Sequence, residues 1–174
     1  METASAQNSH QSKLTIMYFM RSIKIDISRV QLNRAFFELD ILSYFDLMNY
    51  IDELLESGMV AEKQTPRGEY LYLTYKGKSA LEEFIKDVRH SFKLKIDEYC
   101  DSHREEFLAE KDFVGEYFRL SEKEYRVTLR IYEHDVTVFD ISVKMYSEED
   151  AKNAIKNWRT KAPEIHSLIF SMLS

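Results

Sequence analysis

The chain has 174 residues, of which 44% are hydrophobic and 13% are aromatic, enough to bury one compact core or two small ones. Its net charge of −6 excludes nucleic-acid binding that relies on overall charge, because phosphate binding depends largely on Lys and Arg. Residues 1–84 carry 9 Lys and Arg against 12 Asp and Glu, and residues 85–174 carry 15 against 18. Affinity for DNA would therefore depend on where the cations are placed.

Hydropathy and cysteine content indicate in which cellular compartment the protein is expected. No apolar run approaches the roughly 20 residues that cross a bilayer, so no membrane contact is expected. The polar N-terminus lacks the apolar segment of a signal peptide, and residues 1–11 are predicted to form a disordered leader. The single cysteine, Cys100, excludes an internal disulfide and indicates a cytoplasmic protein. Because Cys100 lies on an apolar stripe, we expect a buried core residue rather than a reactive thiol.

The first elements are two helices separated by a short strand. A helix is predicted over residues 13–22, and the β-branched segment 25–27 suits a small strand. Ser28 is a suitable N-cap for a second helix over residues 29–39. Five apolar residues are predicted to bury this second helix: Val30, Leu32, Ala35, Phe36 and Leu39.

A third helix and a hairpin follow. Ser43 is predicted to cap a helix over residues 43–57, and Gly58 suits the left-handed conformation that ends it. Strands over 59–63 and 69–73 flank a turn at 64–68 that contains Pro66 and Gly68. The predicted inner face of the third helix consists of Leu47, Met48, Ile51, Leu54 and Leu55.

The pattern after the hairpin predicts a long helix and then an α+β region. Apolar residues at a period near 3.6 extend from Leu81 to Phe107, so one helix can reach residue 110, with a break near Ser91 or Asp101 left open. Alternation then predicts antiparallel strands over 113–120, 125–133 and 136–146. A helix over 147–161 follows, and Pro163 is predicted to begin a last short helix.

The expected fold class is α+β. A winged helix-turn-helix is predicted over residues 12–84, a linking and dimerisation helix over 85–111, and a small α+β domain over 112–174. In that last domain, two helices are expected to cover one face of a three-stranded antiparallel sheet.

Two segments carry a resemblance to known regulators. They are YIDELLESGMV at residues 50–60 and YLYLTYKGKSAL at residues 70–81. Together they resemble winged-helix regulators of the MarR and PadR type. Over nearly its full length the chain is also similar to an uncharacterised Gram-positive bacterial family, catalogued as a domain of unknown function, whose N-terminal half is a winged helix. The resemblance implies a DNA-binding transcriptional regulator acting as a homodimer.

The candidate DNA-binding residues lie on the third helix, the wing and the second helix. Ser43, Asn49 and Tyr50 are predicted to lie near the bases, although Asp46 and Glu53 on the same face would oppose phosphates. The residues expected at the phosphate backbone are Lys63, Gln64, Thr65 and Arg67 of the wing, with Arg29 and Arg34 of the second helix. The alternatives are a winged helix that binds protein instead of DNA, and a ligand-sensing module with a pocket between the linking helix and the sheet.

Few other residues suggest a site. On the predicted sheet, Arg119, Arg126, Arg130 and Lys144 can cluster to bind an acidic effector or the opposite subunit, the alternative being a solvated face. His134 lies between two acids, but a hairpin turn needs polar residues there in any case. The sequence holds no nucleophile elbow and no phosphate-binding loop. We therefore expect no enzyme activity, no cofactor and no metal site, while a small-molecule effector stays open as a partner.

Overall fold

The computed structural model describes residues 2–174, with side chains from Asn8 onward, and forms two compact units. The N-terminal unit ends at Glu105 and the C-terminal unit begins at Glu106. The division falls inside the helix α5 (His90–Asp112), so most of the predicted linking helix is counted with the N-terminal unit.

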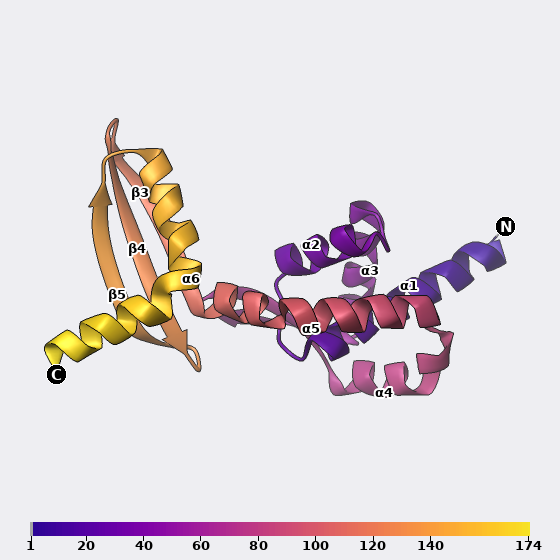
Figure 1. Ribbon diagram of the computed structural model, residues 1–174. Coiled ribbons are helices and arrows are strands. Elements are labelled where there is room, and N and C mark those ends of the chain that lie inside the picture. The colour runs from indigo at the N-terminus through magenta and orange to yellow at the C-terminus, as the bar shows by residue number, and fades with distance from the viewer. Residues whose placement is uncertain (1) are drawn as a thin grey trace. The chain divides into compact units, whose positions relative to one another are not determined.

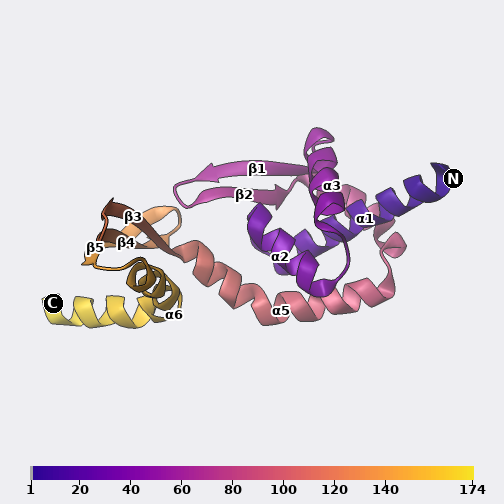
Figure 2. The same ribbon diagram turned by 90° about the horizontal axis from the view of Figure 1, so that it is seen from above.

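The N-terminal unit consists of helices and one small hairpin (Figures 1 and 2). Strands β1 and β2 pair antiparallel, with Val60 opposite Leu73 and Thr65 opposite Gly68. Ile27 adds a bridge to the hairpin, because its N–H and C=O both bond to Leu71, at 3.0 and 2.8 Å. This order of helices and strands is compatible with the winged helix that the sequence predicts. The elements before α5 are α1 (Glu2–Ile23), α2 (Arg29–Leu39), α3 (Tyr44–Glu56), β1 (Val60–Thr65), β2 (Gly68–Leu73), α4 (Tyr75–Phe84) and a 3-10 turn, η1 (Ile85–Asp87).

The helix α1 begins much earlier than predicted. It starts at Glu2, so the segment expected to be a disordered leader is helical from residue 2 onward. At the end of this segment, the side-chain amide of Gln11 donates to the carbonyl of Asp87 at 2.9 Å and accepts from Arg89 at 3.1 Å. These polar bonds join that part of α1 to η1 and to the residues before α5.

The caps of α2 and α3 are those expected. Ser28 and Gln31 form a complete capping box on α2, and Ser43 accepts from the backbone N–H of Asp46 on α3. The predicted burial of Val30 is wrong, since its side chain is 78% exposed. The buried face of α2 runs through Gln31, Leu32, Ala35, Phe36 and Leu39, and this places Val30 outside. On α3 the fully buried residues are Leu47, Ile51 and Leu54.

The apolar stripe predicted for one long helix is divided between two helices. Helix α4 ends at Phe84, η1 follows, and α5 begins at His90, so the break lies just before Ser91, the first of the two positions left open. The stripe on α5 packs within its own unit: the Tyr99 ring lies 6.3 Å from that of Phe19, and its hydroxyl donates to Glu38 at 2.5 Å. The apolar residues of the predicted linking helix therefore pack against α1 and α2 of the same chain.

Cys100 on this stripe is fully buried, and its burial raises the pKa of the thiol to about 12. Since the thiolate is the reactive form, we expect no reaction with a disulfide reagent such as DTNB in the native protein at pH 8. One thiol per chain should react after unfolding in urea. Native reaction at the rate of free cysteine would contradict the packing of α5 on this unit.

The C-terminal unit is a three-stranded antiparallel sheet with a helix on one face (Figure 1). It contains β3 (Phe113–Ser121), β4 (Glu124–Glu133), β5 (Val136–Met145) and α6 (Glu148–Leu173), with β4 in the centre. His134 and Asp135 both have positive φ, at 49° and 67°, and they form the tight turn predicted between β4 and β5. The core of this unit consists of Tyr125, Val127, Leu129, Ile131, Ala151, Trp158 and Ala162.

A single helix, α6, takes the place of the two helices predicted at the C-terminus. Pro163 lies inside α6, and Figure 1 shows that this helix bends. Proline lacks an N–H donor and crowds the preceding turn, so it kinks a helix without always ending it. Ala162 is buried and Ile165 packs on the sheet core, so contacts on both sides of Pro163 hold the helix together.

Candidate interaction surface

The exposed ridge of α3 is acidic. Phe45, Asn49, Asp52 and Glu56 are all exposed and lie three or four residues apart, so they share one face of the helix. The helix α3 contains four acidic residues, Asp46, Asp52, Glu53 and Glu56, and no Lys or Arg. We call the four exposed residues Phe45, Asn49, Asp52 and Glu56 the α3 ridge.

The three predicted base readers differ in position. Ser43 is bound to Asp46, accepting from its N–H at 3.2 Å and donating to its carboxylate at 2.7 Å. Tyr50 is only partly exposed, at the side of α3. Asn49 alone lies on the α3 ridge, and its amide donates to Glu53 at 3.0 Å. Two of the three predicted base readers therefore already form hydrogen bonds within α3, Ser43 as its cap and Asn49 with Glu53.

Arg29 and Lys63, two of the four predicted phosphate-binding cations, have acidic neighbours. Arg29 donates to Asp52 at 3.0 Å and to Glu62 at 2.7 Å, which joins α2 to α3 and β1. Lys63 lies 3.9 Å from the carboxylate of Asp26. Arg34 is partly exposed on α2. These contacts place carboxylates beside the cations where DNA phosphates would have to bind.

The tip of the hairpin is bonded internally. The hydroxyl of Thr65 donates to the carbonyl of Gly68 at 3.0 Å and accepts from the N–H of Arg67 at 3.1 Å. Gln64 donates to Glu69 on the opposite strand. Gln64 and Thr65 therefore stabilise the turn itself.

An exposed aromatic patch lies where α2 meets α3. Phe37 and Phe45 are each 82% exposed, and Tyr44 packs edge-on against Phe45 with 5.6 Å between ring centroids. Phe37 and Tyr44 border a hollow of about 610 Å³ that also contains Asp40. We call Phe37, Tyr44 and Phe45 the aromatic patch. Sequence reasoning missed it, although the predicted buried faces of the two helices already excluded all three residues.

A second hollow, of about 380 Å³, is basic. Arg21 and Lys24 at the end of α1 border it together with Lys78 of α4, Tyr72 of β2 and Asp26. Arg21 lies over the ring of Tyr18 at 4.9 Å. Within the described side chains, Lys24 and Lys78 have no acidic partner at ion-pair distance. These cations were not among the predicted site residues.

The predicted effector cluster on the sheet does not form as a set. Arg119 pairs with Tyr125 while Arg126 pairs with Phe118, so Arg119 lies on the opposite face from Arg126, Arg130 and Lys144. Strand alternation gives the reason, since neighbouring residues point to opposite faces.

Two members of the cluster are neutralised by neighbouring carboxylates. Arg130 donates to Asp140 at 2.8 Å and to Glu116 at 3.1 Å, and these hydrogen bonds raise its pKa. Lys144 lies 2.5 Å from Glu124. Arg130 and Lys144 thus form cross-strand ion pairs on the sheet.

The described residues define a class of protein. Among side chains from Asn8 onward, no three His, Cys, Asp or Glu residues are placed to hold a metal ion. In the same part of the chain, no helix is long and apolar enough to cross a membrane. The molecule is thus an α+β protein of two units with an acidic helix ridge and an exposed aromatic patch.

One family model matches nearly the full length of the chain. The model of a family described as a domain of unknown function, DUF4364, matches residues 12–173, and the chain belongs to this family. Neither the curated proteins nor the solved structures contain a significant match.

Proposed function

We propose that the N-terminal unit is a winged helix that acts in regulation by docking on a protein partner, without inserting α3 into the DNA groove. The order of α1, the Ile27 bridge, α2, α3, β1 and β2 supports the winged helix. Fold alone does not determine function, so the choice of partner depends on the surface chemistry.

The observation that carries this proposal is the charge of α3. The helix has four carboxylates and no cation, and Arg29 is already bound to Asp52. A carboxylate about 4 Å from a phosphate costs on the order of 1 kcal/mol even in bulk water. Non-specific DNA affinity comes almost entirely from phosphate contacts by cations, and the α3 ridge has none to offer.

The aromatic patch supports a protein partner. Phenylalanine and tyrosine are enriched in the centres of protein interfaces, where charged residues are depleted. Phe45 belongs both to the aromatic patch and to the α3 ridge, so the apolar and acidic surfaces are continuous. Charge complementarity then favours a partner that presents apolar side chains flanked by Lys or Arg.

Two measurements on the full chain test this proposal. In mobility-shift assays with pooled genomic fragments, we expect no shift even at about 50 mM salt, where phosphate contacts are strongest. Cross-linked complexes from the source cells should survive nuclease treatment and disappear in a Phe37→Ser, Phe45→Ser double variant. Tyr75→Ser is the matched control, because Tyr75 is an 86% exposed aromatic residue outside the patch. Capture that is lost with nuclease, or unchanged in the double variant, would refute protein docking.

A DNA-binding regulator is the second candidate, and the basic hollow favours it. Lys24 and Lys78 have no acidic partner within the described side chains and can contact a phosphate backbone without α3. If this candidate holds, a shift should occur at low salt and weaken steeply with salt. Lys24→Ala with Lys78→Ala should then lower the salt slope by about 2, whereas Lys156→Ala on α6 should leave it unchanged.

A further inference from the structure

A cavity of about 430 Å³ lies inside the N-terminal unit, between α1, α3 and α4. Its volume falls within the roughly 300–1,000 Å³ of small-molecule sites. It is separate from the aromatic patch and from the basic hollow, because it shares no lining residue with either.

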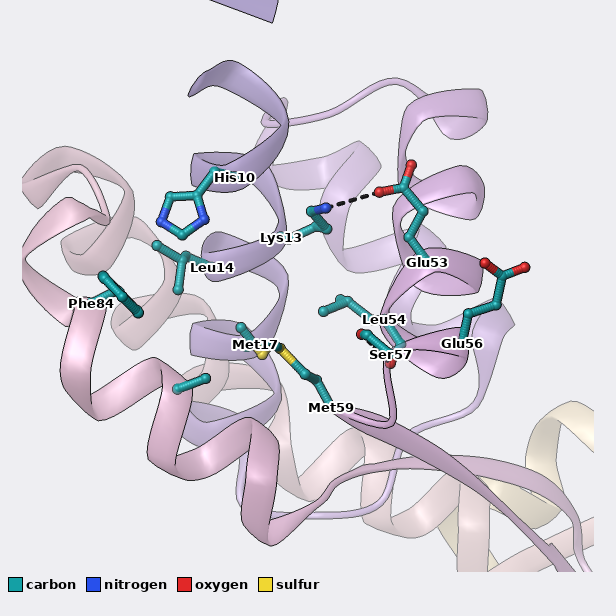
Figure 3. Close-up of a pocket in the computed structure, with 11 residues that line it drawn as sticks. His10, Lys13, Leu14, Met17, Glu53, Leu54, Glu56, Ser57, Met59 and Phe84 are labelled. Carbon is teal, nitrogen blue, oxygen red and sulfur yellow. Dashed lines mark hydrogen bonds and ion pairs between the residues drawn. The ribbon is translucent and has the colours of Figure 1, made fainter. Parts of the chain in front are cut away.

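The interior of this cavity is apolar and adaptable. Figure 3 shows Met17 of α1 and Met59 directed toward each other at its base, with Leu14 and Phe84 on one side and Leu54 on the other. Methionine side chains are flexible and polarisable, and they fit against aromatic rings of varied shape. The cavity therefore suits a flat apolar body.

The rim is charged and has one negative charge in excess. Lys13 of α1 donates to Glu53 of α3 at 2.9 Å, and this ion pair crosses the rim (Figure 3). Glu56 lies three residues further along α3 and has no hydrogen bond or ion pair within the described side chains. The side chains that line the cavity thus carry one lysine against two carboxylates, with His10 against Phe84 at 5.4 Å.

We propose that this cavity binds a small amphipathic cation, with an apolar body between Met17 and Met59 and a protonated amine at the rim near Glu53 and Glu56. An amine would gain the free carboxylate of Glu56. A carboxylate head would find only Lys13, which is already paired with Glu53, and the lining would still carry a second carboxylate at Glu56. Charge complementarity therefore selects the amine.

The site is coupled to the surface of α3 through Glu53, in addition to Glu56, which itself belongs to the α3 ridge. Glu53 accepts from Lys13 with one oxygen and from Asn49 with the other, at 2.9 and 3.0 Å. An amine at Glu53 competes with Lys13 and alters the partner of Asn49, which lies on the α3 ridge. Occupancy of the cavity is thus sensed on the exposed face of the helix.

The test uses three probes that share one ring and differ in the head group: phenethylamine, 2-phenylethanol and phenylacetate. The full chain is labelled with ¹³C at its methionine methyl groups. We expect phenethylamine to shift the Met17 and Met59 signals in a saturable way, and not that of Met172 on α6. Its affinity should exceed that of 2-phenylethanol about tenfold, since a hydrogen bond to a charged group contributes about 1.5 kcal/mol or more. Phenylacetate should bind more weakly than either.

Variants separate the contribution of the amine head group to binding from that of the apolar cavity. Glu56→Gln should lower phenethylamine affinity about tenfold and leave 2-phenylethanol unchanged. Ala80→Phe fills the cavity and should abolish binding of both probes, while Glu82→Gln, an exposed acid on α4 outside the lining, should change neither. Far-UV circular dichroism serves to check that each variant is folded. Equal affinity for the three probes, or no shift of Met17 and Met59 with any of them, would overturn the proposal.

Discussion

Replacement of Trp158 by alanine is expected to unfold the C-terminal unit or to leave it without fixed tertiary packing. Trp158 is 1% exposed, stacks on Phe139 and donates from its indole nitrogen to the carbonyl of Arg130 at 3.1 Å. Truncating a buried tryptophan typically costs about 3–5 kcal/mol. A small unit with one sheet and one covering helix has little stability in excess of that loss. The amide NMR spectrum should show collapsed dispersion for β3, β4 and β5.

Two further variants serve as controls for Trp158→Ala. Trp158→Phe keeps the ring against Phe139 but leaves the Arg130 carbonyl without its donor, so it should cost much less, about 1–3 kcal/mol, and leave the sheet folded. Lys156→Ala changes an exposed residue two positions away and should have almost no effect. A dispersed spectrum for Trp158→Ala would show that the sheet core does not depend on this ring.

Gly77→Ala is expected to destabilise the N-terminal unit by about 3 kcal/mol or more. A Cβ atom at this position would lie 2.1 Å from the carbonyl oxygen of Met59 and 2.8 Å from the Leu73 side chain. That carbonyl cannot move freely, because it accepts from both the N–H and the hydroxyl of Thr74, at 3.1 and 3.0 Å. The substitution therefore separates α4 from the start of the hairpin. The urea midpoint followed by far-UV circular dichroism measures the change.

Gly58→Ala is the matched comparison. Gly58 has φ of +70° but open space around its Cβ position, so alanine there should cost only about 1–2 kcal/mol, from the left-handed backbone. If Gly77→Ala were as mild as Gly58→Ala, the close approach of α4 to Met59 would not be a rigid feature of the fold.

The local pattern of the chain predicts most elements of the C-terminal unit because strand alternation and turn chemistry agree there. Val127, Leu129 and Ile131 alternate with polar residues, and the predicted strand over 125–133 differs from β4 by one residue. The predicted alternation fails at the start of β5. Ile131 pairs with Phe139 and Tyr132 pairs with Thr137, so Val138 is an extra residue and Thr137 changes face. The alternation of apolar and polar residues in the sequence does not reveal a bulge of this kind.

Long-range contacts explain the parts that the sequence did not predict. The first turns of α1 have no apolar periodicity, and the bonds from Gln11 to Asp87 and Arg89 join residues far apart in the chain. The persistence of α6 through Pro163 depends on packing against the sheet. Propensity and periodicity describe neighbours in the chain, so neither can anticipate such contacts.

The candidate site was only partly predictable for the same reason. The acidity of the third helix is plain in its residues, and the doubt it raised about DNA contact came from the sequence alone. The pairing of Arg29 with Asp52 and Glu62 required the three-dimensional arrangement, because these residues come from three different elements. The cavity behind α3 is likewise made by segments as distant as His10 and Phe84.

The packing of α5 on α1 and α2 has a consequence for the kinetics of assembly. Tyr99 and Cys100 are buried within one chain. A second copy of the chain can therefore pack on this face of α5 only by displacing α1 and α2 of the same chain. A dimer built in that way would be a domain swap. Its subunits would exchange only as fast as this face of α5 unfolds locally, so two labelled populations should mix much more slowly than those of a simple surface dimer.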